Sequence, residues 1–276
     1  MSILHCRPSG TLRRLQLGCF IYFLTTINAL ASEVRPQYCG SGTVSTIAFV
    51  GDLIFHSDLQ RIAMAQGATY GQFWSAANSI FRSVDAVYGN LEGTISSNVT
   101  YLGERVADPG RNFGSKVYSA PSELLNFNYH PSLARDLKRS GFRVVSTGNN
   151  HALDRGTSGI DQTVDRLESA GVVAVGTRHS QRRRHDWGRL TQVGDLNIGW
   201  VSCTFGTNGY PDPLDQVLDC YTEKPQTLAA ISGLAARRDV DAVFFVPHWG
   251  IENQLVIARR QSSLAREAIS AGAAIV

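Results

Sequence analysis

The sequence predicts an α/β fold in which short strands alternate with helices and polar residues gather at one edge of the sheet. Three observations predict it. Short apolar runs that end in glycine alternate with stretches of helical periodicity. Polar side chains directly follow several of these runs. The 276 residues, 43% of them hydrophobic and 18% charged, are enough for one large core and match no disordered or fibrous class.

The first 31 residues are predicted to be a signal peptide. Three arginines within the first 14 residues form a basic region, residues 15–30 are largely apolar, and a small-x-small pattern ends at Ala31. An uncleaved membrane anchor is the alternative to cleavage after Ala31. We therefore expect an exported protein, located in the periplasm or on the extracytoplasmic face of the membrane. The formal net charge of +3 does not suggest nucleic acid as a partner.

The first half of the domain, which we expect to occupy residues 44–276, shows strand and helix patterns in turn. Residues 44–50 form a continuous apolar run that ends in Gly-Asp, which is typical of a buried strand. Residues 72–83 carry aromatic and aliphatic side chains at helical spacing, and residues 86–88 begin the next strand. A helix over 131–140 has a proline near its first turn and stops at a glycine.

The same alternation continues through the second half. Further strands are expected at residues 143–147, 172–175, 196–203, 242–246 and 273–276. Further helices are expected at residues 158–170, 226–236 and 255–271. Regular alternation of this kind implies a layered α/β domain whose strands pair largely in parallel.

The cysteines leave two interpretations open. Without the signal peptide the chain retains Cys39, Cys203 and Cys220, in what we expect to be an oxidising compartment. Cys203 and Cys220 flank a segment rich in glycine, proline and aspartate, and a disulfide between them would close that segment. The alternative is that both thiols are reduced and half-buried.

Polar residues at the carboxyl ends of the predicted strands are the main functional signal. They are Asp52, Asn90 with Glu92, Asn150 with His151, and His248 with Glu252. Because the carboxyl ends of strands form the ligand-binding edge of α/β sheets, four segments would bring oxygen and nitrogen ligands to one rim. Carboxylate, amide and imidazole groups suit divalent zinc, manganese or iron. Each residue alone could be a helix cap or a turn residue, but their joint occurrence favours a metal site.

Five segments, in order, resemble the signature motifs of the bacterial capsule and poly-gamma-glutamate synthesis (CapA) family. They are residues 49–52, 89–93, 148–156, 204–209 and 247–252. The Asn-Asn-His-x-x-Asp-x-Gly sequence in the third segment is the most specific of these motifs. The resemblance covers nearly the whole chain from about Val44 onward.

The CapA family in turn resembles the calcineurin-like metallophosphoesterases. This resemblance implies a four-layer β-sandwich, in which two mixed sheets pack together and helices flank both, and it implies two divalent metal ions. The family closes its metal site with a Gly-His-x-x-His-like motif after one more strand. We therefore expect the chain to be a fragment that stops before this last motif, with an incomplete metal site.

The resemblance also implies roles for individual residues. Asp52 would bind the first metal ion, and Asn90 or Glu92 would take the place of a bridging aspartate. Asn150 and His248 would bind the second ion. His151 would be a catalytic residue that donates a proton, and Asp154 would be a catalytic residue that orients His151. Asn149 and Glu252 would bind the substrate.

The implied function is that of a metal-dependent hydrolase or transferase in capsule or poly-gamma-glutamate synthesis. Its expected partners are an anionic polymer and membrane-bound capsule synthesis proteins. The alternative is a non-catalytic component that binds or assembles the polymer. The basic run at residues 178–189 either holds an anionic polymer or forms a solvated loop.

Overall fold

The computed structural model describes residues 44–65, 69–182 and 187–276, so the predicted signal peptide and Cys39 lie outside the described residues. In this part of the chain the strands form two sheets. The first sheet has the order β1 (Ile47–Leu53), β2 (Ala86–Leu91), β3 (Phe142–Ser146), β4 (Val173–Val175), with parallel neighbours. In the second, β5 (Arg189–Val193) pairs antiparallel with β6 (Leu196–Val201), which pairs parallel with β7 (Ala242–Phe245).

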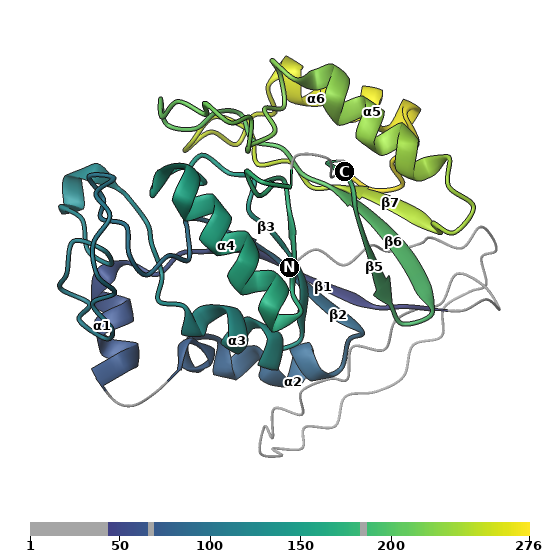
Figure 1. Cartoon of the computed structure of the whole chain (residues 1–276). Coiled ribbons are helices and arrows are strands. Elements are labelled where there is room, and N and C mark those ends of the chain that lie inside the picture. The colour runs from purple at the N-terminus through teal and green to yellow at the C-terminus, as the bar shows by residue number, and fades with distance from the viewer. Residues whose placement is uncertain (1–43, 66–68, 183–186) are drawn as a thin grey trace, which may run out of the picture. The chain divides into compact units, whose positions relative to one another are not determined.

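Helices cover the outer face of each sheet. The elements that follow β1 to β3 are α1 (Ser57–Ala65), the 3₁₀ helix η1 (Tyr70–Ala77), α2 (Asn78–Arg82), the 3₁₀ helix η2 (Ser122–Leu124), α3 (Ser132–Arg139) and α4 (Gly156–Ala170). The helices α5 (Lys224–Ala235) and α6 (Arg259–Ser270) flank β7 in the chain. Figure 1 shows α3 and α4 beside the first sheet and α5 and α6 along the second. In the described residues no helix is long and apolar enough to cross a bilayer.

The two sheets pack face to face through an aromatic core. Tyr88 of β2 stacks on Trp200 of β6, with ring centroids 5.3 Å apart and an interplanar angle of 5°. Phe244 of β7 meets the edge of Trp200 at 5.1 Å. Trp200 is completely buried, and its indole N–H donates to Thr191 Oγ1 at 2.8 Å. The buried indole N–H group is therefore satisfied by a partly buried threonine of the neighbouring strand.

Both faces of the strand β2 are covered by other layers of the fold, and both carry apolar side chains. Side chains alternate along a strand, so Ala86 and Tyr88 face the second sheet while Val87 and Leu91 face the helices. A third cluster packs the outer face of the second sheet against α5 and α6. The order helix, sheet, sheet, helix confirms the expected four-layer sandwich. The resemblance implied two mixed sheets, but the described strands of the first sheet are all parallel.

Several elements differ from the predicted ones. The helix expected at 72–83 begins as a 3₁₀ helix, and α1 and β5 were not predicted. The expected strand at 273–276 contributes only an isolated bridge between Ile275 and Phe244. The strand β5 begins in the basic run and has few apolar residues. Its pairing is set by the two-residue turn of Gly194 and Asp195, where Gly194 has a φ of +56°.

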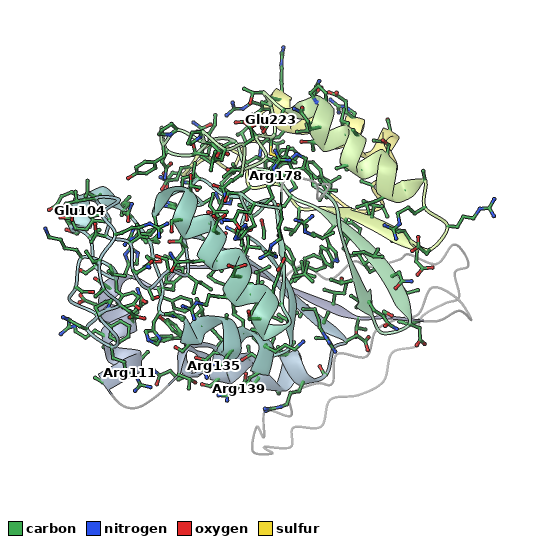
Figure 2. The ribbon with its side chains drawn as sticks, viewed as in Figure 1. Glu104, Arg111, Arg135, Arg139, Arg178 and Glu223 are labelled. Atoms are coloured by element: carbon green, nitrogen blue, oxygen red, sulfur yellow. A yellow bond between two sulfur atoms is a disulfide. The ribbon has the colours of Figure 1, made fainter. Side chains whose placement is uncertain are left out.

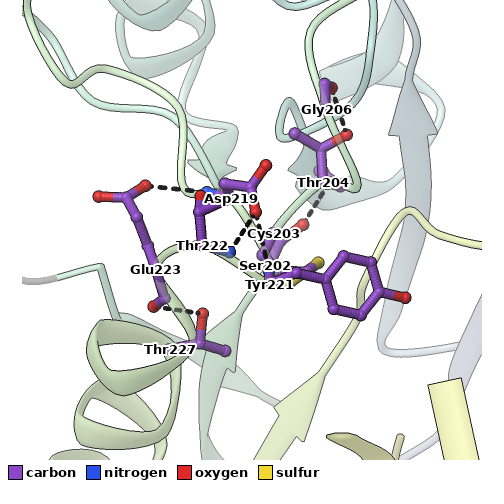
Figure 3. The surroundings of a disulfide bond; sticks show 11 residues. Ser202, Cys203, Thr204, Gly206, Asp219, Tyr221, Thr222, Glu223 and Thr227 are labelled. Atoms are coloured by element: carbon purple, nitrogen blue, oxygen red, sulfur yellow. Dashed lines mark hydrogen bonds between the residues drawn. A yellow bond between two sulfur atoms is a disulfide. The ribbon is translucent and has the colours of Figure 1, made fainter. Parts of the chain in front are cut away.

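A disulfide joins Cys203 to Cys220, with their Cα atoms 5.0 Å apart, and this decides between the two interpretations of these cysteines. Figure 3 shows its surroundings. The backbone N–H groups of Tyr221 and Thr222 both donate to Asp219 Oδ1. Thr204, next to Cys203, forms isolated bridges to Asp219 and His248. The disulfide therefore holds both ends of the loop at residues 204–219 against the end of the second sheet.

Candidate metal centre

A bulge in β1 sets the direction of Asp52. Before Val50 the register with β2 is regular, but Asp52, rather than Gly51, pairs with Asn90, so β1 contains one extra residue. Because side chains alternate along a strand, an unbroken register would place Asp52 on the helix-facing side with Val50. The bulge turns Asp52 to the same side as Asn90. The Asn90 Nδ2 atom donates to Asp52 Oδ1 at 2.8 Å.

Asp52, Glu92 and His248 form a set of candidate metal ligands. One ligand atom from each lies within 4.8 Å of the others. Asp52 is exposed, Glu92 is buried directly after β2, and His248 follows β7, so both sheets contribute. Two carboxylates and an imidazole are a donor set that suits a divalent zinc, manganese or iron ion. The residues therefore fit the class of metal that the sequence predicted.

Burial shifts the pKa of two of these ligands. Desolvation, helped by the nearby Asp52 carboxylate, raises the pKa of Glu92 to about 7, although His151 opposes the change. Burial also lowers the pKa of His248 below its usual value, against the attraction of Asp52. A neutral imidazole keeps the lone pair that a metal ion needs. A bound cation would offset the cost of ionising Glu92 in this buried position.

The turn after β3 brings His151 to the same rim. His151 Nδ1 lies 2.8 Å from Asp154 Oδ2, which also accepts from the backbone N–H of Phe127. Since an ionised carboxylate only accepts, Nδ1 carries the hydrogen and Nε2 is the free nitrogen. Nε2 lies 3.8 Å from Glu92 Oε1. Both His151 and Asp154 are buried, and this burial raises the pKa of Asp154 despite the opposing effect of His151.

Asn208, which had no predicted role, lies beside His151 at the candidate metal centre. Its Nδ2 atom lies 3.4 Å from His151 Nε2, and its Oδ1 atom accepts from Asn150 Nδ2 at 3.1 Å. Asn208 has a φ of +52°, a left-handed conformation that asparagine tolerates better than most residues. Asn208 lies in the motif at residues 204–209, which indicated the family resemblance. The motif did not predict that Asn208 would contact His151.

The side-chain oxygen of Asn150 is left without a partner. Its Nδ2 atom is engaged by Asn208, and among the described residues no group donates to its buried Oδ1 atom. Buried polar atoms are nearly always satisfied, so such an exception needs a reason. An amide oxygen without a hydrogen bond, next to His151, is suited to bind a cation.

The two predicted substrate-binding residues, Asn149 and Glu252, differ in their exposure to solvent. Asn149 is completely buried, and its side chain contacts Asn90, Leu91 and the backbone of His151 rather than solvent. Glu252 is exposed in the loop after β7, where its charge contributes to the raised pKa of Glu92. Asn149 therefore contacts protein groups only, whereas Glu252 is open to solvent.

The described part of the basic run is engaged within the protein. Arg182 pairs with Asp165 and Glu168 of α4. Arg178, labelled in Figure 2, lies 4.4 Å over the ring of Trp187 and donates from Nε to the Asp215 carbonyl at 2.6 Å. Both arginines therefore help to hold neighbouring segments of the fold together.

Residues 46–276 match the family model described as Bacterial capsule synthesis protein PGA_cap. The PGA biosynthesis protein CapA of Bacillus subtilis (strain 168) is 24% identical over 266 residues, which are 93% of this chain and 62% of that protein. The Capsule biosynthesis protein CapA of Bacillus anthracis is 22% identical over 241 residues, which are 84% of this chain and 53% of that protein. The chain thus spans between about half and two thirds of these relatives.

A solved structure is similar in outline. It is that of a putative 5′-nucleotidase from Staphylococcus aureus in complex with alpha-ketoglutarate, with 18% sequence identity and a TM-score of 0.40. The match covers 82% of this chain and 43% of that one. The family model covers residues 46–276, which are nearly all the residues that the structure describes. The chain belongs to the bacterial capsule synthesis protein family PGA_cap.

Proposed function

We propose that this protein is a metal-dependent hydrolase or transferase acting on an anionic polymer, poly-gamma-glutamate or a capsular polysaccharide, during capsule biosynthesis. The observation that carries the proposal is the close approach of the Asp52, Glu92 and His248 ligand atoms beside His151. The names of the two Bacillus relatives support the substrate class. The predicted signal peptide and the Cys203–Cys220 disulfide support a location in the periplasm or on the outer face of the membrane, near membrane-bound synthesis proteins.

The proposal includes two divalent ions of the zinc, manganese or iron class. Asp52, Glu92 and His248 would hold one ion, and the free Oδ1 atom of Asn150 would bind the other. When bound, such ions supply Lewis-acid polarisation of the substrate oxygen and stabilise the negative charge that develops during bond cleavage.

The chain's own residues would handle the proton. Asp154 fixes the His151 ring through Nδ1, so Nε2 faces the rim that carries the candidate ligands. In its protonated form, His151 would donate from Nε2 to the leaving oxygen or nitrogen. The Asn208 Nδ2 atom, 3.4 Å from Nε2, would keep the ring in this position between turnovers.

The test is His151→Ala in protein purified with manganese or zinc and given poly-gamma-glutamate or a phosphoester substrate. We expect metal content to be retained and turnover to fall by about 10²–10⁴-fold, the usual contribution of a positioned proton donor. His179→Ala is the matched control, since His179 lies beside Asp161 and Asp165 outside the rim. Unchanged turnover in the His151 variant would contradict the proposed chemistry.

A second candidate function is a polymer-binding or assembly component without catalysis. The specific observation in its favour is that the Asn90 amide nitrogen, which cannot bind a cation, faces all three candidate ligands. Metal analysis separates the two functions. Polymer binding that persists without stoichiometric metal would favour the second.

A further inference from the structure

Two backbone groups fix the orientation of the Asn149 side chain. The carbonyl oxygen of Leu91 can only accept, and it lies 2.8 Å from Asn149 Nδ2. The backbone N–H of His151 can only donate, and it lies 3.1 Å from Asn149 Oδ1. The nitrogen and oxygen of this buried amide therefore cannot be exchanged without losing both hydrogen bonds.

The orientation of Asn149 fixes that of Asn90. The second hydrogen of Asn149 Nδ2 is directed to the Asn90 side chain, and the atom that receives it at 3.0 Å is Asn90 Oδ1. The nitrogen of the Asn90 amide must then face the other way. Asn90 is itself buried, so water does not offer it an alternative set of partners.

The Asn90 nitrogen faces all three candidate metal ligands. It lies 2.8 Å from Asp52 Oδ1, 3.3 Å from Glu92 Oε2 and 3.3 Å from His248 Nδ1. Each of these atoms can accept a hydrogen bond, His248 Nδ1 in the tautomer that carries its hydrogen on Nε2, and the two hydrogens of the amide are shared among the three acceptors. A primary amide nitrogen has no lone pair available for a metal ion, so this arrangement makes Asn90 a donor to the ligands.

We propose that Asn90 is a positioning residue that holds Asp52, Glu92 and His248 together by hydrogen bonds and does not bind the cation, and that Asn149 fixes it in this role. The inference rests on the proposed metal-dependent function. It identifies which residues set the affinity of the site for a cation. The Asn90 oxygen could reach a cation only if its amide rotated. Rotation would place its nitrogen against the nitrogen of Asn149 and its oxygen against two carboxylates.

The proposal predicts that residue 90 limits cation affinity. With asparagine, the ion held by Asp52, Glu92 and His248 has no ligand from β2 itself and has the positive end of an amide dipole beside it. Asn90→Asp replaces that nitrogen by a carboxylate oxygen, while its other oxygen can still accept from Asn149. The number and charge of the ligands tune metal affinity over decades.

The experiment measures binding of Mn²⁺ and Zn²⁺ by titration calorimetry in four proteins: wild type, Asn90→Asp, Asn90→Ala and His248→Ala. We expect Asn90→Asp to bind about tenfold or more tightly than wild type. Asn90→Ala removes no ligand but loosens the ligand set that Asn90 holds, so we expect it to lose about tenfold in affinity. His248→Ala removes a ligand of the same ion and should lose about a hundredfold or more. Circular dichroism of each variant checks that it is folded.

The outcomes distinguish this inference from the proposed function. If Asn90→Ala loses as much affinity as His248→Ala, Asn90 is a ligand and the inference is overturned while metal dependence stands. If Asn90→Asp binds and wild type does not, the inference is supported and the wild-type protein is not a metalloenzyme. If neither binds a cation, both fall. A metal-free readout also applies: in chelator, Asn90→Asp should melt below wild type, because a third carboxylate replaces the donor.

Discussion

Asp154 connects the His151 ring to the backbone of the loop before α3. Its Oδ2 atom accepts from both His151 Nδ1 and the Phe127 N–H, while its buried Oδ1 atom has no partner among the described residues. Asp154→Asn keeps the size of the side chain but removes its charge and leaves a buried N–H group without an acceptor. We expect kcat to fall by about 10–100-fold with little change in KM, since such supporting residues act on orientation. A change confined to KM would contradict this role.

Glu92 makes stability depend on pH. Its pKa of about 7 in the folded protein exceeds the usual 4.5, so the native state binds the proton more tightly than the unfolded state. The stabilisation is therefore complete below about pH 4.5 and is lost as pH rises through about 7. In chelator we expect the free energy of unfolding, measured in urea, to fall by roughly 1–3 kcal/mol between these limits. Glu92→Gln should remove most of this dependence.

The sequence located most of the candidate site because residue type and position along the chain carry that information. Asp52, Glu92 and His151 come at the ends of strands of the first sheet, which share one edge, and His248 follows a strand of the second sheet that ends beside them. The amide orientations could not be predicted in this way. They depend on which donor or acceptor faces Asn149, and two of its three partners, Asn90 and Leu91, lie far from it in the chain.

Among the elements, α3 carries a buried carboxylate at Asp136. This group accepts from the backbone N–H of Tyr70 at 3.0 Å, and burial raises its pKa although the hydrogen bond opposes the change. An asparagine at this position would still accept through its oxygen without the cost of a buried charge. We expect Asp136→Asn to stabilise the protein at neutral pH by about 0.5–1.5 kcal/mol, with no gain at acid pH where the aspartate is protonated. Thermal melts at both pH values test this.

The loop at residues 204–219 depends on its disulfide. Cross-linking a loop of this length is worth about 3 kcal/mol in the chain-entropy model. A Cys203→Ser, Cys220→Ser double variant should lose roughly that much stability in urea unfolding. Because Asn208 lies in this loop, activity should also fall, whereas cation affinity at Asp52, Glu92 and His248 should change little. Equal stability of the variant and wild type under oxidising conditions would count against the prediction.

The periodic elements were predictable and the short ones were not. Long helices such as α4 and α5 begin and end within about two residues of their predicted positions, because local signals mark their ends, such as Gly171 after α4 and the proline in the first turn of α5. The short helix α1 and the strand β5 lack such signals, and β5 is a strand because β6 offers it an edge to pair with. The bulge in β1 likewise exists only relative to β2.

In the whole molecule, Trp200 is the centre of the contact between the sheets. It is completely buried between Tyr88 and Phe244. Trp200→Ala should cost about 3–5 kcal/mol in urea unfolding, as expected for removing a large aromatic from a core. Trp74→Ala is the comparison, because Trp74 is only partly buried and should cost less. Similar losses for both variants would mean that the contact between the sheets is not the main source of stability.

The division of the ligands between the sheets has a thermodynamic consequence. Asp52 and Glu92 belong to the first sheet and His248 to the second, so an ion bound to all of them would cross-link the two halves of the sandwich. Linkage then makes the effect reciprocal: the cation would stabilise the packed sheets, and tighter packing would raise the affinity for the cation by the same free energy.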